Sequence, residues 1–264
     1  MRMRRALFLG IALPVLAGCA AVSQVNLLST EQEVEMGAQF AAEVEKEMAM
    51  LDDAAVESYI DSLGQVLARN SDRPDIAYRF RVVDTDEVNA FALPGGFVYV
   101  NRGLVTTAEN ESELAGVIAH EVGHVVGRHS AKMITRQYGI AMIAQIALGE
   151  NPGVVKELVA NIAATGALMK YSRDAEREAD RLGIDETVRS GIDPAGIVTF
   201  FDKLKGLQQR EPSAVESFFS THPDTEERIA YTDRYIASLS AAGVGTRDSD
   251  RFQRIQDRIE KRAR

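Results

Sequence analysis

The sequence lacks several features that define whole classes of protein. It has one cysteine and no tryptophan among 264 residues, and only four histidines. A single cysteine excludes an intramolecular disulfide framework and a zinc site built from cysteines alone. Basic residues number 30 against 39 acidic ones, and the net charge of −9 argues against nucleic acid as a partner. The hydrophobic content of 45% is that of a globular chain with a sizeable core.

The amino-terminal segment is typical of an export signal. Three arginines within the first five residues precede an apolar run over residues 6–17, which is too short to cross a bilayer stably. The run ends in Leu-Ala-Gly-Cys at residues 16–19, which resembles the lipobox of bacterial lipoprotein signals. The resemblance implies cleavage before Cys19 and attachment of lipid to its thiol, with the membrane as a partner through that lipid. An ordinary secretory signal that ends in cysteine is the alternative.

The lipobox divides the chain into a signal over residues 1–18, a lipidated tether over 19–28, a folded domain over 29–240 and a charged tail over 241–264. Removing the signal takes away three arginines and no acid, so the net charge falls from −9 to −12. Ala20 follows the cysteine, and the lack of aspartate there resembles the enterobacterial signal for the outer membrane. We therefore expect a protein held by lipid in the bacterial envelope, on an outer-membrane surface that faces the periplasm.

Hydrophobic periodicity predicts an α+β fold in which helices predominate. A capping box formed by Thr30 and Glu33 begins a helix that ends near residue 50, and Asp52 or Asp53 can cap the next helix. The tail carries a narrow apolar stripe, which favours docking on the body of the protein. Further helices are expected over residues 111–133, 154–169, 172–190, 194–207 and 225–239.

A small β-sheet is predicted beside the helix over residues 111–133. Apolar residues alternate from Ile76 to Val82, which predicts one strand. Residues 88–93 and 97–101 predict two more strands, joined by the Pro-Gly-Gly turn between them. An exposed edge of this hairpin could bind an extended polypeptide through backbone hydrogen bonds, and the alternative is an ordinary internal hairpin. The candidate substrate-binding residues are Asn89, Ala90, Phe91, Ala92, Pro94 and Gly95.

The apolar segment over residues 139–148 has two interpretations. About ten apolar residues are too few to span a membrane. The segment, followed by the break at residues 149–153, is either one buried helix of a helical hairpin or a mobile cover over the active site. Periodicity does not distinguish the two.

Three of the four histidines lie within ten residues, and two of them belong to the motif His-Glu-Val-Gly-His over residues 120–124. On a helix, His120 and His124 project from one face and can hold one Zn²⁺ at about 2.0–2.1 Å. Glu121 lies next to a metal-bound water and would act as the general base, passing the proton of that water to the leaving amine. His129 lies about 140° round the same helix from His124. We expect it to miss the metal and to serve in packing or hydrogen bonding.

A catalytic zinc needs a third protein ligand, and no further histidine has the required spacing. The segment Ser-Arg-Asp-Ala-Glu-Arg-Glu-Ala-Asp over residues 172–180 places Glu176 and Asp180 on one helix face and Glu178 nearly opposite. We expect Glu176 to be the third ligand and Asp180 to orient a ligand histidine. Small residues on both helices, among them Gly123 and Ala179, would allow the close approach. An ordinary solvated charge run is the alternative.

Three motifs follow one another along the chain: HEVGH, SRDAEREAD and, over residues 221–229, THPDTEERI. In this order they resemble the successive signatures of the zinc metallopeptidases that include HtpX and the CAAX prenyl proteases. The resemblance extends over about residues 30–240 and implies Glu176 as third ligand. It also implies that His222 faces the zinc, either bonding the catalytic oxyanion or filling the open metal position at rest. Arg228 would support this segment or pair with a site carboxylate. No membrane-spanning helix is evident in the sequence. In this respect the chain differs from both named members of the family and resembles its soluble periplasmic branch, which is anchored by lipid.

The function expected from these patterns is a zinc endopeptidase of the envelope. Its substrates would be polypeptides, above all misfolded or misassembled envelope proteins. The second hypothesis is a chaperone or assembly factor for outer-membrane proteins with weak or latent protease activity. A purely structural zinc site ranks last, because such sites have four cysteine or histidine ligands. The oligomeric state stays open.

Overall fold

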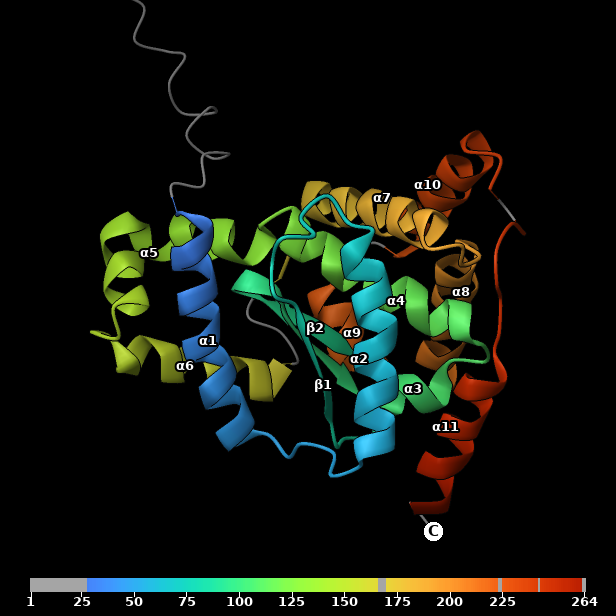
Figure 1. Ribbon diagram of the computed structural model, residues 1–264, viewed down its shortest axis with the longest axis horizontal. Helices are drawn as coiled ribbons and strands as arrows, with labels where there is room; N and C mark the ends of the chain where they lie inside the picture. Colours follow the sequence, from blue (N-terminus) through green and yellow to red (C-terminus); the bar gives the residue numbers. More distant parts are fainter. Residues whose placement is uncertain (1–27, 166–169, 223–224, 242, 263–264) are drawn as a thin grey trace, which may run out of the picture.

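The computed structural model describes residues 28–165, 170–222, 225–241 and 243–262 (Figure 1). The signal predicted over residues 1–18 and the lipidation site Cys19 lie outside these ranges, as does nearly all of the tether. The described part is mainly helical with one small three-stranded sheet, which confirms the predicted fold class. Within it, no helix has the length and apolar character that crossing a bilayer requires.

The sheet consists of β1 (Arg79–Val83), β2 (Ala90–Leu93) and β3 (Phe97–Asn101) in the order β1-β3-β2. β2 and β3 pair antiparallel, as the hairpin pattern predicts, and β1 pairs parallel to β3. A 3₁₀ turn over Pro94–Gly96 joins the two strands of the hairpin. Gly95 has a φ of 76°, a backbone conformation that residues other than glycine rarely adopt. Because the strand order is β1-β3-β2, β2 is an edge strand of the sheet.

The first two helices begin at polar caps. Ser29 caps α1 (Thr30–Glu47) and forms a reciprocal capping box with Gln32, so the box predicted at Thr30 lies one residue too late. Glu33 does not bond back to the cap, because its buried carboxylate accepts from Arg73 and Arg128. Asp53 caps α2 (Ala54–Arg69), one of the two predicted candidates.

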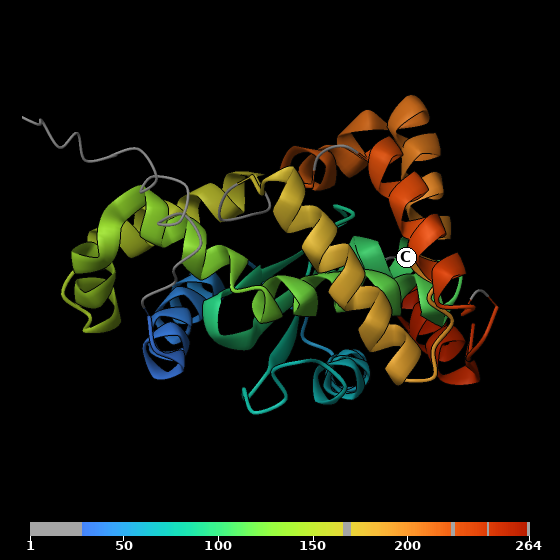
Figure 2. The same cartoon turned by 90° about the horizontal axis from the view of Figure 1, so that it is seen from above.

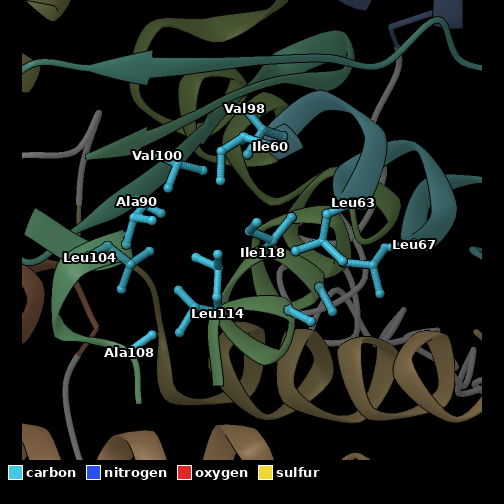
Figure 3. Packing of buried hydrophobic residues seen from close by; sticks show 14 of the residues in the cluster. Ile60, Leu63, Leu67, Ala90, Val98, Val100, Leu104, Ala108, Leu114 and Ile118 are labelled. Carbon is cyan, nitrogen blue, oxygen red and sulfur yellow. The ribbon is translucent and has the colours of Figure 1, made fainter. Parts of the chain in front are cut away.

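The main apolar core lies between the sheet and the helices on one side of it (Figure 3). Side chains of α2, β2 and β3 meet those of α3 (Arg102–Thr107) and α4 (Glu111–Val126) there. Burial of this kind stabilises by roughly 25 cal/mol per Å² of apolar area. The core thus fixes α4, which carries the metal motif, against the sheet. The labelled residues are Ile60, Leu63, Leu67, Ala90, Val98, Val100, Leu104, Ala108, Leu114 and Ile118.

The helix predicted over residues 111–133 is in fact two helices. α4 ends at Val126, and α5 (His129–Ala147) begins after Arg128, which has a left-handed φ of 55°. A left-handed residue cannot continue an α-helix, so the chain changes direction there. The prediction of one continuous helix is wrong at this point.

The apolar segment over residues 139–148 forms the second half of α5 and turns back onto α6 (Pro152–Thr165). α5 kinks at Gly139, whose φ of 76° is not helical. Ile143 and Ile146 are buried in a second apolar cluster together with side chains of α1 and α6. This placement agrees with the interpretation as a buried hairpin helix.

The described residues after α6 are mainly helical; α7 and α8 pack on α4, while α10 and α11 lie further out (Figure 1). The elements expected there are found, and the tail helix docks through its predicted apolar stripe of Phe252, Ile255 and Ile259. Two short helices, α3 and α9, were not predicted. The described helices from here on are α7 (Arg173–Arg189), α8 (Gly196–Arg210), α9 (Pro212–Thr221), α10 (Thr225–Ser238) and α11 (Asp250–Arg262).

Candidate metal centre

The site forms where α7 crosses α4, which Figure 2 shows from above. The two helices approach at backbone distance. A Cβ added to Gly123 of α4 would lie 2.6 Å from the carbonyl oxygen of Ala179, and one added to Gly183 of α7 would lie 2.9 Å from the backbone of Ala119. The small residues on both helices therefore bring their polar faces into contact, as the sequence predicts.

Four side chains converge at this crossing. Nε2 of His120 lies 3.0 Å from Nε2 of His124 and 3.3 Å from Nδ1 of His222. The carboxylate of Glu176 lies 3.2 Å from Nδ1 of His222 and 3.6 Å from Nε2 of each of the other two histidines. One ligand atom from each residue lies within 4.8 Å of all the others. The predicted ligands thus meet, together with His222 from the end of α9.

The donor set fits a zinc ion. In a tetrahedral site with bonds of about 2.0–2.1 Å, the ligand atoms lie about 3.3 Å apart, and five of the six pairs formed by these side chains lie 3.0–3.6 Å apart. Imidazole and carboxylate are ligands that Zn²⁺ accepts. All four are buried, with exposures of 1% or less, so the centre is closed off from solvent in this structure.

The charges around the centre also favour a cation. Burial and Arg228 lower the pKa of His120, but its hydrogen bonds to Asp180 and Glu176 outweigh them and raise it to about 9. Burial raises the pKa of Glu176, yet Arg228 and the neighbouring histidines hold it well below its usual value. Glu176 is therefore ionised at neutral pH, and the cluster attracts positive charge.

Glu121 lies beside the cluster with its carboxylate free. Oε1 is 3.5 Å from Nε2 of His222, and neither carboxylate oxygen has a hydrogen-bond partner among the described residues although the side chain is only 1% exposed. A buried, unsatisfied carboxylate is unfavourable unless a further group binds there. Burial raises its pKa, against the lowering by His222 and His120. This is the environment of a general base.

Asp180 contacts His120 on the side away from the cluster. Oδ1 of Asp180 lies 2.9 Å from Nδ1 of His120. A proton held at Nδ1 by this carboxylate leaves the lone pair of Nε2 for a metal. The guanidinium of Arg228 donates to both oxygens of Asp180 at 2.8 and 2.6 Å, and its Nη1 lies 2.7 Å from Glu176.

The edge of β2 is connected to this centre by two side chains. The carbonyl oxygen of Ala92 accepts from the hydroxyl of Ser130 at 3.1 Å, and Ser130 also bonds the hydroxyl of Tyr171 at 2.9 Å. The ring of Tyr171 stacks on His124 with the ring centroids 3.8 Å apart. The backbone of Asn89 bonds β3, so by alternation the backbone groups of Ala90 and Ala92 face the unpaired edge.

Other residues of the predicted substrate hairpin have internal contacts. The side-chain amide of Asn89 donates to Ser217 at 2.9 Å, and the ring of Phe91 stacks on Tyr99. Pro94 and Gly95 pack against the backbone of α1, which leaves no room for a Cβ at Gly95. The structure brings these four residues to the sheet and to α1, not to the metal cluster.

A buried His-Glu-x-x-His helix that meets a glutamate from a neighbouring helix defines a zinc metallopeptidase. The comparison with known protein families agrees. Residues 54–236 match the family described as Peptidase family M48, and the chain belongs to this family of zinc metalloendopeptidases.

Curated relatives extend beyond this chain. It is 35% identical over 214 residues to the beta-barrel assembly-enhancing protease of Escherichia coli, a match that covers 78% of this chain and 44% of the relative. It is 35% identical over 163 residues to the metalloprotease YcaL of Escherichia coli, covering 60% and 62%, and 34% identical over 183 residues to the mitochondrial metalloendopeptidase OMA1 of Arabidopsis thaliana, covering 69% and 36%. The chain thus spans less than half of the first of these relatives.

Two residues of the centre were not predicted from the sequence. Tyr171 and Ser130 were not singled out, although Tyr171 directly precedes the cap of the carboxylate helix and Ser130 lies six residues beyond the metal motif. Their proximity in sequence was the only available signal. His129 lies outside the four-residue cluster, and its hydrogen bond to His124 follows from the helix break at Arg128, not from the continuous helix that we expected.

Proposed function

We propose that this zinc metalloendopeptidase cleaves polypeptides of the bacterial envelope, to which Cys19 anchors it by lipid. The observation that carries the catalytic part is the free carboxylate of Glu121 beside three buried ligands, His120, His124 and Glu176. A site built only for structure has no use for a buried carboxylate that is left without a partner.

The bound zinc supplies a Lewis acid that polarises the scissile carbonyl and lowers the pKa of water. Glu121 takes a proton from the attacking water and delivers it to the nitrogen of the leaving amine. Burial raises the pKa of Glu121, which makes its carboxylate a stronger base towards the proton of the water. Asp180 keeps the proton of His120 on Nδ1 throughout.

His222 occupies a fourth ligand position in the proposed resting state. Its Nδ1 lies 3.2–3.3 Å from atoms of Glu176 and His120, the spacing found within the ligand set itself. A substrate that needs the open metal position must displace this ring. Of the two roles left open by the sequence, we propose the second, in which His222 closes the site at rest.

The edge of β2 that faces away from β3 is the proposed binding surface for substrate. The sequence led us to expect an exposed edge, but Ala90 and Ala92 are only 1% and 3% exposed, so a substrate must first uncover this edge. Ala90 and Ala92 offer backbone groups that an extended peptide can pair with, independently of its sequence. The carbonyl of Ala92 is already bonded by Ser130, which also holds Tyr171 over His124. A peptide that adds to this edge competes with Ser130 for the same carbonyl.

The location and substrates of the enzyme are proposed from the amino terminus and from the relatives. The lipobox at residues 16–19 supports an anchor that faces the periplasm from the outer membrane. A relative named for enhancing β-barrel assembly supports misassembled outer-membrane proteins as substrates.

A second candidate function is supported by the burial of the site. Because the ligands and Glu121 are each at most 1% exposed, a chain in this closed state would hold clients without cutting them. A chaperone or assembly factor with latent protease activity is therefore the alternative.

The test is proteolysis of casein, an unfolded substrate, by protein that lacks residues 1–19. Cleavage should require zinc, stop on addition of a chelator and return when zinc is restored. Glu121→Gln should lower the rate at least about a hundredfold while zinc stays bound, since general-base catalysis contributes 10²–10⁴-fold.

The matched control is Asp174→Asn, which neutralises a carboxylate on α7 that is 95% exposed. It should cleave like the parent. Activity that survives both the chelator and Glu121→Gln would contradict the proposed chemistry. A Glu121→Gln protein that fully replaces the parent in cells would favour the chaperone.

A further inference from the structure

A row of three polar side chains leads from the molecular surface to the metal centre. Nδ1 of His129 lies 2.8 Å from Nδ1 of His124, and Nε2 of His129 lies 3.2 Å from Oε2 of Glu178. His129 is only 4% exposed, whereas the side chain of Glu178 is 47% exposed. His129 is thus the buried link between a surface carboxylate and a candidate zinc ligand.

The hydrogens in this row can be assigned from chemistry. The carboxylate of Glu178 can only accept, so Nε2 of His129 carries a hydrogen and Nδ1 of the neutral ring carries a lone pair. Only one hydrogen fits between two Nδ1 atoms, and it must then belong to His124. Nε2 of His124 is left with its lone pair, and this is the atom that faces the ligand cluster.

We propose that His129 is a positioning residue of the zinc site, which, backed by Glu178, fixes the tautomer and the ring orientation of His124. This inference rests on the proposed role of His124 as a zinc ligand. Partners of this kind hold ligand histidines in many metal sites and raise their basicity. Asp180 contacts Nδ1 of His120 directly in the equivalent way, whereas on the Nδ1 side of His124 the carboxylate of Glu178 acts through the imidazole of His129.

The helix break between α4 and α5 makes this contact possible. On a continuous helix, His129 would point about 140° away from His124. The left-handed Arg128 turns the chain so that the ring of His129 folds back under the end of α4. A Cβ at Gly127 would lie 2.5 Å from Nε2 of His129, so only glycine leaves room for the ring.

His129 and Glu178 line a surface pocket of about 790 Å³, and another residue of this pocket can serve as a control. Lys132 lines the same pocket as His129 and Glu178 but makes no hydrogen bond in the row. Replacing Lys132 by alanine changes the local charge but keeps Nδ1 of His129 as the hydrogen-bond acceptor of His124.

The experiment measures the dissociation constant of zinc for the chain without residues 1–19, by competition with a chelating dye. His129→Leu removes the acceptor and should weaken binding 10–100-fold. His129→Asn restores an acceptor oxygen near the place of Nδ1 and should stay within about threefold of the parent. Glu178→Ala removes the acceptor for Nε2 of His129 and should weaken binding to an intermediate extent, and Lys132→Ala should leave it unchanged.

Two further readouts separate positioning from a merely structural role. The visible spectrum of the cobalt-substituted protein reports the ligand geometry and should change in His129→Leu but not in His129→Asn. The melting temperature of the chelated protein reports folding alone. If His129→Leu does not fold, Glu178→Ala decides, because it removes the exposed acceptor for Nε2 of His129, and unchanged zinc affinity in that variant would overturn the inference.

Parental affinity in a folded His129→Leu, or equal weakening in His129→Leu and His129→Asn, would also overturn it. A parent chain that binds no zinc would remove the proposed function and this inference together. A parent that binds zinc with variants that do not differ from it removes the inference alone.

Discussion

Three of the four candidate ligands are each held by a further side chain that is itself buried. Asp180 bonds His120, Arg228 pairs with Glu176, and His129 bonds His124. Glu121 differs, because within the described ranges no group donates a hydrogen bond to its carboxylate oxygens. The ligand side chains are thus fixed in orientation by their partners, whereas Glu121, the proposed general base, keeps a carboxylate that can exchange a proton.

The closing role of His222 gives a prediction at this scale. His222→Ala should raise the basal rate of casein cleavage several-fold at saturating zinc, because it removes the fourth ligand that the substrate must otherwise displace. The matched control is Ser220→Ala, which alters an exposed residue of the same helix and should leave the rate unchanged. A lower rate in His222→Ala would instead support a role at the oxyanion, and an unchanged rate would contradict the closing role.

The ligands could be predicted from the sequence because helix geometry relates residues four apart. His120 with His124, and Glu176 with Asp180, share helix faces whatever the rest of the fold does. Tyr171 and Ser130 could not be assigned in this way. Their contacts join three segments that only tertiary packing brings together.

At the scale of elements, the crossing of α4 and α7 determines the site. Gly123→Ala should lower the free energy of unfolding by about 1–3 kcal/mol and weaken zinc binding. The added Cβ would lie 2.6 Å from the backbone oxygen of Ala179, and forcing the helices apart outweighs the gain in helix propensity.

Gly153→Ala is the matched control, because a Cβ there meets nothing within 4 Å. It should stay within about 0.5 kcal/mol of the parent in urea titrations. Gly123→Ala with parental stability and zinc affinity would show that the crossing tolerates more space than the structure allows.

The docking of α11 gives a prediction of pH dependence. Burial raises the pKa of Asp53, but Arg258, Arg262 and two backbone amides of α2 outweigh it and lower the pKa to about 2. A lowered folded-state pKa stabilises above the unfolded value of 3.8, and this stabilisation is lost as the pH falls towards 2. Asp53→Ala should therefore cost about 1–2 kcal/mol at pH 7, measured by urea unfolding.

The gap between parent and Asp53→Ala should close between about pH 4 and pH 2. Asp53→Asn keeps a capping oxygen but not the charge, and it should lose less at pH 7 than Asp53→Ala. A gap that stays constant down to pH 2 would contradict the charged role of Asp53.

Long periodic helices could be predicted from the sequence, whereas breaks and short helices could not. The hydrophobic pattern runs through residues 111–133 without interruption, so it does not reveal the turn at Arg128. α3 has only six residues and α9 ten, and windows that short do not separate helix from buried strand or loop.

At the scale of the whole molecule, the four candidate ligands come from three separate segments: α4, α7 and the end of α9. A bound zinc would therefore link parts of the chain about a hundred residues apart in sequence, such as His120 and His222.

Zinc should stabilise the folded chain for this reason. Each tenfold rise of free zinc above the dissociation constant should add about 1.4 kcal/mol to the free energy of unfolding. The melting temperature should rise with zinc and fall with a chelator in the parent, and the response should be much weaker in Glu176→Ala. A melting temperature that does not change with zinc concentration would contradict the proposed coupling between zinc binding and folding.

Anomalous X-ray diffraction at the zinc absorption edge, from crystals of the chain without residues 1–19, tests the central claim most directly. The account predicts a single strong peak per chain, between Nε2 of His120, Nε2 of His124 and the carboxylate of Glu176. A crystal grown with zinc that shows no peak there, or its main peak elsewhere, would contradict the assignment of the metal centre.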